Sequence, residues 1–260
     1  MPGTQIGLSM LFCLGEPFKT LLKRLHEVDV DTVEILDEGF HTLNNRRVKA
    51  LKKVIQSRSL EITVHAPFAD INIASHAHLF RRVFLKRLEK SISYARQLDC
   101  RLWVFHPGIK TGISSFYPGL EWQLNLDSIR KLLRIGEKHD VKIAVENVPE
   151  PFPFLMKSVD DFSRFYNELG EYIGLTLDVG HAHLNGQIQS YITHFSNKIV
   201  HIHVSDNDGT FDHHLGVGQG TIDWVSFSKA VKGMGYCNIV MLESTEHVQE
   251  SLQTLHSLFA

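Results

Sequence analysis

The chain has little cysteine and no long apolar run. Its 260 residues include three cysteines, Cys13, Cys100 and Cys237, which are widely spaced and odd in number. This pattern excludes a disulfide framework or a zinc knuckle, so we expect the thiols to be small buried apolar residues. No apolar stretch approaches the roughly 20 residues that span a bilayer. The N-terminus also lacks the basic and apolar regions of a signal peptide, which predicts a soluble, cytoplasmic protein without a membrane partner.

The chain also has little net charge. The formal net charge is -2 at pH 7, so its overall electrostatics do not favour nucleic acid as a partner. One local basic run, Arg46, Arg47, Lys49, Lys52 and Lys53, is typical of a solvated helix face. There is no G-x-G-x-x-G after the first apolar run and no P-loop, which disfavours a nucleotide-binding fold.

What the chain does have is a regular alternation of short apolar runs with longer amphipathic segments. Eight such units in one chain of this size predict a single-domain (β/α)8 TIM barrel over residues 1–260, with a doubly wound open sheet as the alternative. The expected strands are Gln5–Met10, Thr32–Leu36, Glu61–Ala66, Arg101–His106, Lys142–Asn147, Ile173–Asp178, Ile199–Val204 and Asn238–Glu243. The expected helices include Phe18–Glu27, Asn45–Gln56, His78–Leu98, Leu126–His139, Val159–Leu169 and His247–Phe259.

Six of the expected strands end in a residue that can bind a metal ion. These residues are His65, His106, Glu146, Asp178, His203 and Glu243, and three further candidates, His181, Asp212 and His214, follow two of the same strands. A parallel barrel brings its strand ends into one ring, so these side chains are expected to meet at one mouth. Nitrogen and oxygen ligands without thiolates favour Zn²⁺, Mn²⁺ or Fe²⁺.

The smallest complete ligand set comes from four successive strands. It consists of Glu146, Asp178, His203 and Glu243. Two carboxylates that flank one ion can also exchange protons with a substrate, which makes Glu146 and Glu243 the expected acid/base pair. The structural alternative for either glutamate is a buried ion pair.

Spacing predicts how the remaining candidates reach the mouth. Gly180 is expected to let the backbone turn sharply after Asp178, which would return His181 to the mouth. Asp212 and His214 are two apart, so an extended loop would place both on one side, with His213 in solvent.

The same period of two orients the neighbouring side chains. If His106 points into the barrel, Trp103 and Phe105 point outward. His201 shares the parity of His203 and is expected to be a core histidine one layer deeper. In the proline-rich segment ENVPEPFPF, Phe152 and Phe154 either line the pocket or cover the barrel helices.

These motifs resemble the xylose isomerase-like TIM-barrel superfamily, which includes sugar-phosphate isomerases and epimerases and the endonuclease IV class of AP endonucleases. The resemblance is most specific from His65 to Glu243. The epimerase pattern implies one metal ion held by the four-residue set. The endonuclease IV pattern implies a trinuclear zinc cluster held by all nine candidates.

The segments around the ligands differ from the endonuclease pattern. The stretch HAPFADINIAS keeps an aromatic residue, Phe68, but has Ala69 and Asp70 where the DNA wedge is expected. We therefore favour a metal-dependent sugar or sugar-phosphate isomerase/epimerase that acts through an enediolate on a small carbohydrate. The alternative is a zinc-dependent AP endonuclease or phosphodiesterase acting on DNA. In either case the cofactor is expected to be one to three divalent ions, Zn²⁺ or Mn²⁺.

Overall fold

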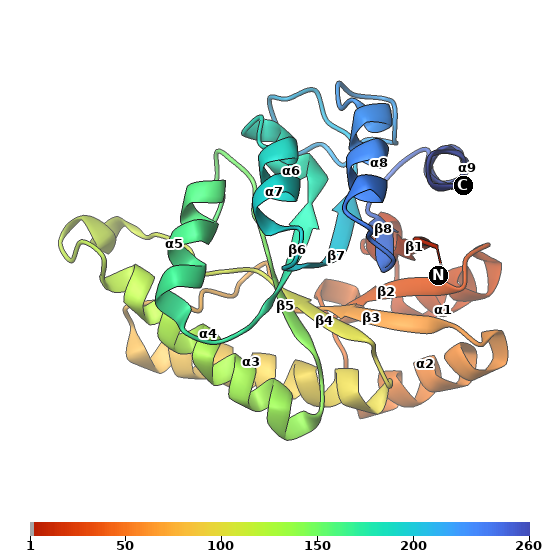
Figure 1. Cartoon of the computed structure of the whole chain (residues 1–260). Coiled ribbons are helices and arrows are strands. Elements are labelled where there is room, and N and C mark those ends of the chain that lie inside the picture. The colour runs from red at the N-terminus through yellow and green to blue at the C-terminus, as the bar shows by residue number, and fades with distance from the viewer. Residues whose placement is uncertain (1–2) are drawn as a thin grey trace.

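A computed structural model describes residues 3–260 and shows a closed barrel of parallel strands (Figure 1). The strands follow chain order, and β1 pairs with β8 to close the ring. This confirms the predicted barrel and excludes the open sheet. The strands are β1 (Gln5–Ser9), β2 (Thr32–Leu36), β3 (Glu61–His65), β4 (Leu102–Phe105), β5 (Ile143–Glu146), β6 (Gly174–Asp178), β7 (Ile199–Val204) and β8 (Ile239–Leu242).

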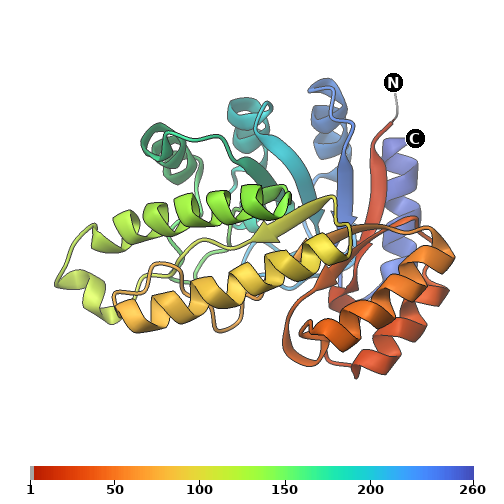
Figure 2. The same cartoon turned by 90° about the horizontal axis from the view of Figure 1, so that it is seen from below.

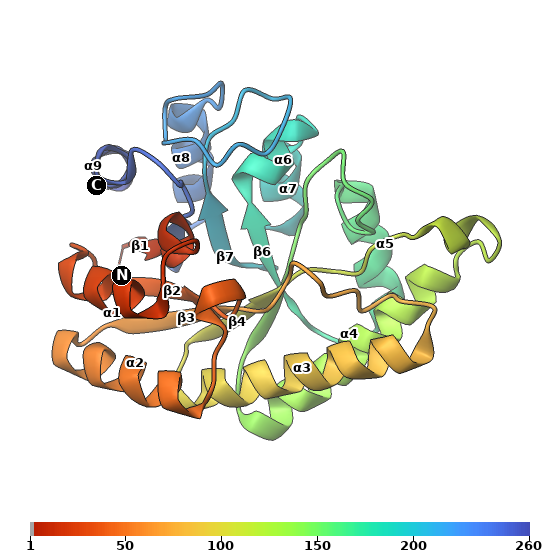
Figure 3. The ribbon, with the colours of Figure 1, turned by 180° about the vertical axis from the view of Figure 1, so that it is seen from behind.

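The helices lie outside the strands. Figure 2 shows the two longest, α3 and α4, side by side, and Figure 3 shows them from behind the barrel. The last helix, α9, packs beside β8 and the first strand, β1. The helices are α1 (Phe18–Glu27), α2 (Asn45–Arg58), α3 (His78–Gln97), α4 (Leu120–His139), α5 (Val159–Leu169), α6 (Val179–Leu184), α7 (Ile188–Phe195), α8 (Trp224–Gly233) and α9 (Val248–Phe259).

Every strand end lies within one residue of its predicted position, but the helices differ more. The expected start of α4 at Leu126 is wrong, because the helix begins at Leu120. Its extra turns are held by Trp122, whose indole donates to the Glu168 carboxylate on α5 at 2.8 Å. No bounds were predicted for α6, α7 and α8; α6 and α7 are short, and short helices give little periodic signal.

Side chains on β4 alternate between the two faces as predicted. Trp103 and Phe105 pack outward among the helices, and the Trp103 indole donates to Ser91 on α3 at 3.1 Å. Val104 points the other way and packs with Leu102 and Ala144 in a separate cluster. His106 follows on the inward parity, which brings it to the mouth.

A register shift in β7 sets the depth of its histidines. Leu175 pairs with Ile199 and Thr176 pairs with His201, so Val200 is an extra residue in the ladder. Gly174 makes room for it, because a Cβ at Gly174 would lie 2.4 Å from a Val200 methyl group.

The cysteines and the basic run were predicted only in part. Cys13 is buried and Cys100 is half-buried, but the expectation for Cys237 is wrong, because its side chain is exposed. The basic run is a solvated face of α2, apart from Arg47, which is half-buried over the Phe18 ring. Within residues 3–260, no helix has both the length and the apolar character needed to cross a membrane.

Candidate metal centre and active site

Four side chains converge at the carboxyl end of the barrel. Glu146 and Asp178 are the last residues of β5 and β6, His203 is near the end of β7, and Glu243 directly follows β8. All four are buried, and one ligand atom from each lies within 4.8 Å of the others. His203 Nδ1 is central, at 3.4 Å from Glu146 Oε2 and 3.4 Å from Glu243 Oε2.

A second group of ligand atoms shares Glu146. His65 Nε2 lies 3.3 Å and His106 Nε2 3.5 Å from Glu146 Oε2. His65 Nδ1 lies 2.8 Å from the Ala66 carbonyl oxygen and donates to it, because a carbonyl can only accept. Whenever the ring is neutral, its Nε2 lone pair therefore faces the mouth.

A third group lies beside the first two. Asp212 Oδ2 is 3.2 Å from His181 Nε2 and 3.2 Å from His214 Nε2. His181 Nδ1 donates to the Asn147 carbonyl oxygen at 2.8 Å, so its Nε2 also faces the mouth. The nine candidates thus all lie at one mouth, in three groups, of which the first two share Glu146.

His181 reaches the mouth by a different route from the one expected. The predicted sharp turn at Gly180 is wrong, because Gly180 lies inside α6. Asp178 caps that helix by accepting from the His181 N–H at 2.6 Å. Gly180 is needed for close packing, since a Cβ there would lie 3.0 Å from Ser205 Oγ at the end of β7.

The loop that carries Asp212 and His214 was expected to be extended, but it is bent. His214 has a φ of 48°, in the left-handed region, and this bend turns its ring back toward Asp212. His213 is exposed, as predicted. Asp206 anchors the loop from below, where it accepts from the Trp224 indole at 2.7 Å and the Gly218 N–H at 2.9 Å.

The spacing of the ligand atoms fits a metal ion. Atoms bound about 2.1 Å from a tetrahedral ion stand roughly 3.4 Å apart, close to the 3.2–3.5 Å separations within the three groups. Several buried atoms also have no hydrogen-bond partner among the described residues, including Asp178 Oδ2, His203 Nδ1 and Asp212 Oδ1. Buried polar atoms are normally satisfied, so these orphaned atoms fit a bound cation.

Glu146 and Glu243 have opposite proton affinities. Burial favours the protonated form of Glu146, but the charges and hydrogen bonds of His203 and His106 hold its pKa well below the usual range. Burial raises the pKa of Glu243 to about 7, with smaller contributions from Glu34 and Glu146, although His203 opposes the shift. In the metal-free protein near pH 7, one carboxylate is therefore ionised while the other can hold a proton.

Two of the histidines, His65 and His181, favour the protonated, positively charged form, whereas burial lowers the pKa of His106. Burial lowers the pKa of His65, yet contact with Glu146 outweighs it and raises the pKa to about 9. Burial also lowers the pKa of His181, but the surrounding carboxylates outweigh this effect and raise the pKa to about 10. The metal-free mouth thus carries protons on imidazoles where a cation would bind, so metal and protons compete for the same atoms.

Aromatic side chains line the cavity above these ligands. Its volume is about 370 Å³, and Phe68, Phe152 and Phe154 line it. This settles the two alternatives for Phe152 and Phe154 in favour of the pocket. Glu38 fixes the Phe68 segment by accepting from the N–H groups of Phe68 at 2.8 Å and Ala69 at 3.0 Å.

The sequence reasoning missed three supporting residues, Glu34, Asn147 and Asp206. Glu34 is fully buried on β2 and lies 3.4 Å from His203 Nε2. Asn147 fixes the end of β6, since its side chain accepts from the Asp178 N–H at 2.7 Å and donates to the Asp178 carbonyl at 2.9 Å. The only available signal was for Glu34, as the single charged residue of an otherwise uncharged strand, TVEIL.

Known proteins are similar to this chain in sequence or in structure. A protein of Methanocaldococcus jannaschii described only as uncharacterized is 29% identical over 244 residues, which cover 92% of this chain and 83% of the relative. The inosose isomerase of Bacillus subtilis is 29% identical over 130 residues, covering 46% of this chain and 45% of that enzyme. A crystal structure of a D-tagatose 3-epimerase-like protein superposes with a TM-score of 0.91 at 27% identity, covering 98% of this chain and 97% of that one.

A family profile extends the likeness to nearly the whole barrel. The profile described as xylose isomerase-like TIM barrel matches residues 22–258. That span runs from the first helix to the last and includes all nine residues at the mouth. The chain therefore belongs to the xylose isomerase-like TIM-barrel family.

Proposed function

We propose that this protein is a divalent-metal-dependent sugar isomerase or epimerase. The observation that carries the proposal is the placement of Glu146 and Glu243, each 3.4 Å from the same His203 nitrogen and on either side of it in the group of four ligands. Such a pair can act as base and acid on one bound substrate. The inosose isomerase and the D-tagatose 3-epimerase-like protein support the same reaction class.

Glu146, Asp178, His203 and Glu243 would hold the ion, preferably Zn²⁺ or Mn²⁺, through one nitrogen and several carboxylate oxygens. The bound metal would supply electrophilic stabilisation of negative charge on the substrate oxygens as the neighbouring C–H is deprotonated.

The proton transfers belong to the two glutamates. Glu146, which is ionised, takes the proton from the carbon beside the carbonyl and leaves an enediolate. Glu243, on the other side of the site, returns one to carbon. Delivery to the opposite face of the same carbon gives the epimer. Delivery to the former carbonyl carbon, together with transfer of the hydroxyl proton from one enediolate oxygen to the other, gives the aldose–ketose isomer. Exchange with solvent then restores both glutamates for the next turnover.

The cavity suits a small substrate. Its volume of about 370 Å³ lies in the range of small-molecule sites, roughly 300–1,000 Å³. Phe68, Phe152 and Phe154 shield the ligand cluster from water, which strengthens the electrostatic interactions inside it.

A zinc-dependent phosphodiesterase of the AP endonuclease type is the second candidate. The observation that favours it is the pair of extra ligand groups, His65 and His106 with Glu146, and His181 and His214 with Asp212. Three ions in these groups could stabilise the attacking and leaving oxygens of a phosphodiester. For a sugar isomerase, the additional histidines would bind substrate hydroxyls or carry protons.

One parallel experiment separates the two candidates. The purified protein is analysed for metal content, and the metal-loaded form is incubated with ketoses, with their phosphates and with duplex DNA that contains an abasic site. We expect interconversion of a ketose or its phosphate, no incision of the DNA and loss of turnover after chelation. Three zinc ions per chain together with incision of the DNA would establish the phosphodiesterase instead.

A further inference from the structure

Glu34 lies beneath the ligand cluster and points into the barrel. It is the third residue of β2 and is fully buried. Its neighbours across the sheet are Ser9 on β1 and Thr63 on β3, both also fully buried. A carboxylate in such a place is costly unless other groups compensate its charge.

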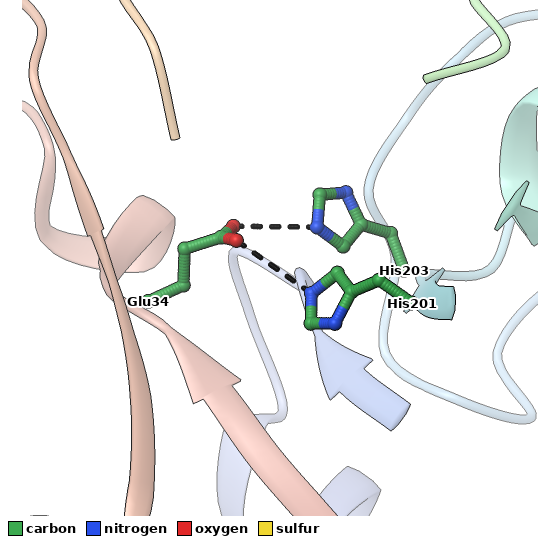
Figure 4. A group of neighbouring side chains, drawn as sticks. All are labelled: Glu34, His201 and His203. Carbon is green, nitrogen blue, oxygen red and sulfur yellow. Dashed lines mark ion pairs between the residues drawn. The ribbon is translucent and has the colours of Figure 1, made fainter. Parts of the chain in front are cut away.

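The compensation comes from two histidines of β7 (Figure 4). Glu34 Oε1 lies 3.4 Å from His203 Nε2, and Glu34 Oε2 lies 3.7 Å from His201 Nε2. Oε2 also accepts a hydrogen bond from Thr63 Oγ1 at 3.1 Å. One oxygen of the Glu34 carboxylate thus faces each of the two imidazole rings.

His203 consequently lies between acidic groups on both sides. Its Nδ1 faces Glu146 and Glu243, while its Nε2 faces Glu34. A neutral imidazole has one N–H and one lone pair, so one nitrogen must donate and the other accept. A proton on Nε2, directed at Glu34, leaves the Nδ1 lone pair free for the ion. A proton on Nδ1 would leave the Nε2 lone pair facing a carboxylate.

We propose that Glu34 is a positioning residue that fixes the ring orientation and tautomer of His203, so that Nδ1 is presented to the metal. This inference rests on the proposed metal site. Carboxylates that accept from the far nitrogen of a metal-binding histidine typically contribute 10–100-fold to metal affinity or activity. Thr63 Oγ1 donates to the other oxygen of Glu34 at 3.1 Å, and His201 Nε2 faces that oxygen at 3.7 Å.

The same three residues could themselves be considered a metal site, since their ligand atoms lie within 4.8 Å of one another. Their chemistry disfavours this. An ion between Glu34 and His203 Nε2, with another at Nδ1, would require His203 to lose both ring protons and bridge two cations. In addition, Glu34 Oε2 already accepts a hydrogen bond from Thr63 Oγ1.

The test measures metal binding rather than turnover. Zn²⁺ affinity and stoichiometry are determined for the wild-type chain, for Glu34→Gln and for Glu34→Asp. The matched control is Glu121→Gln, which alters another buried carboxylate that lies 3.9 Å from a histidine, His76, outside the barrel mouth. We expect Glu34→Gln to bind Zn²⁺ about 10–100-fold more weakly at unchanged stoichiometry, Glu34→Asp to recover part of the loss, and the control to match wild type.

A spectroscopic measurement keeps the proposal testable even if Glu34→Gln does not fold. NMR of ¹⁵N-histidine-labelled, zinc-loaded wild type reports which nitrogen of His203 carries the proton, with the signal assigned by its loss in His203→Gln. We expect a proton on Nε2. A proton on Nδ1, unchanged affinity in Glu34→Gln, or loss of one whole ion per chain in Glu34→Gln would overturn the positioning role.

These outcomes are distinguishable from failure of the proposed function. If the wild-type chain binds no divalent ion, the proposed metal enzyme itself fails. If it binds Zn²⁺ and Glu34→Gln binds equally well, only the positioning role fails.

Discussion

The substitution Glu146→Gln perturbs the side chain that two of the three ligand groups share. Glu146 Oε2 lies 3.3 Å from His65 Nε2, 3.4 Å from His203 Nδ1 and 3.5 Å from His106 Nε2. Its Oε1 lies 3.5 Å from His181 Nδ1. Glutamine keeps the shape of the side chain but removes its charge and its ability to accept a proton from carbon.

Two magnitudes follow for this substitution. Loss of a general base typically lowers turnover by about 10²–10⁴-fold, which corresponds to roughly 3–5 kcal/mol in the activation free energy. In the metal-free protein, removing one partner from a buried charge network costs about 3–5 kcal/mol of unfolding free energy, because the imidazolium groups lose their shared counter-charge.

The assay compares turnover, metal content and denaturant unfolding of the metal-free form with wild type. Glu121→Gln is again the matched control, because it removes the charge of a buried glutamate on α4 away from the mouth. We expect the control to retain wild-type turnover and metal content. Retained turnover in Glu146→Gln would refute the assignment of Glu146 as the base, whatever happens to stability.

Two further predictions concern pH and the ligand loop. The raised pKa values of His65 and His181, about 9 and about 10, mean that their protonation stabilises the metal-free fold fully below pH 6.5 and progressively less as pH rises through those values. Thermal unfolding in a chelator should therefore show a falling midpoint between pH 6.5 and 10, with a smaller fall in zinc-loaded protein; a midpoint that rises over this range would contradict the ion pairing. Trp224→Phe removes the indole donor to Asp206, which should cost about 1–3 kcal/mol of unfolding free energy and speed hydrogen exchange in the loop around Asp212. Unchanged exchange there would show that Asp206 does not anchor the loop.

The positions of the ligands at the strand ends were the part of the site that could be predicted from the sequence. Each strand is short and apolar, and its ligand comes at the point where the apolar run stops, as at His65 and Glu146. Barrel closure then places residues that are distant in the chain at one mouth. The fold and the grouping of the nine candidates could be predicted for this reason.

What could not be predicted depends on packing between elements. Glu34 looks like an exposed residue of an alternating strand until closure of the barrel places it beneath His203. Gly180 suggests a turn, yet its role is close packing against Ser205. The early start of α4 depends on Trp122, whose partner Glu168 lies on another helix. Two of the helices that were not predicted do begin at a capping residue: Asp178 accepts from the His181 N–H in α6, and Asp223 accepts from the Ser226 N–H in α8 at 3.0 Å.

The central claim is that Glu146 and Glu243 move protons to and from the carbon beside a carbonyl of a small sugar. The most direct measurement is NMR of metal-loaded protein with a panel of ketoses in deuterated water. The account predicts that deuterium enters at the carbon next to the carbonyl as the epimer or isomer appears, and that chelation stops both. No exchange with any sugar of the panel, together with incision of abasic DNA by the same preparation, would contradict it.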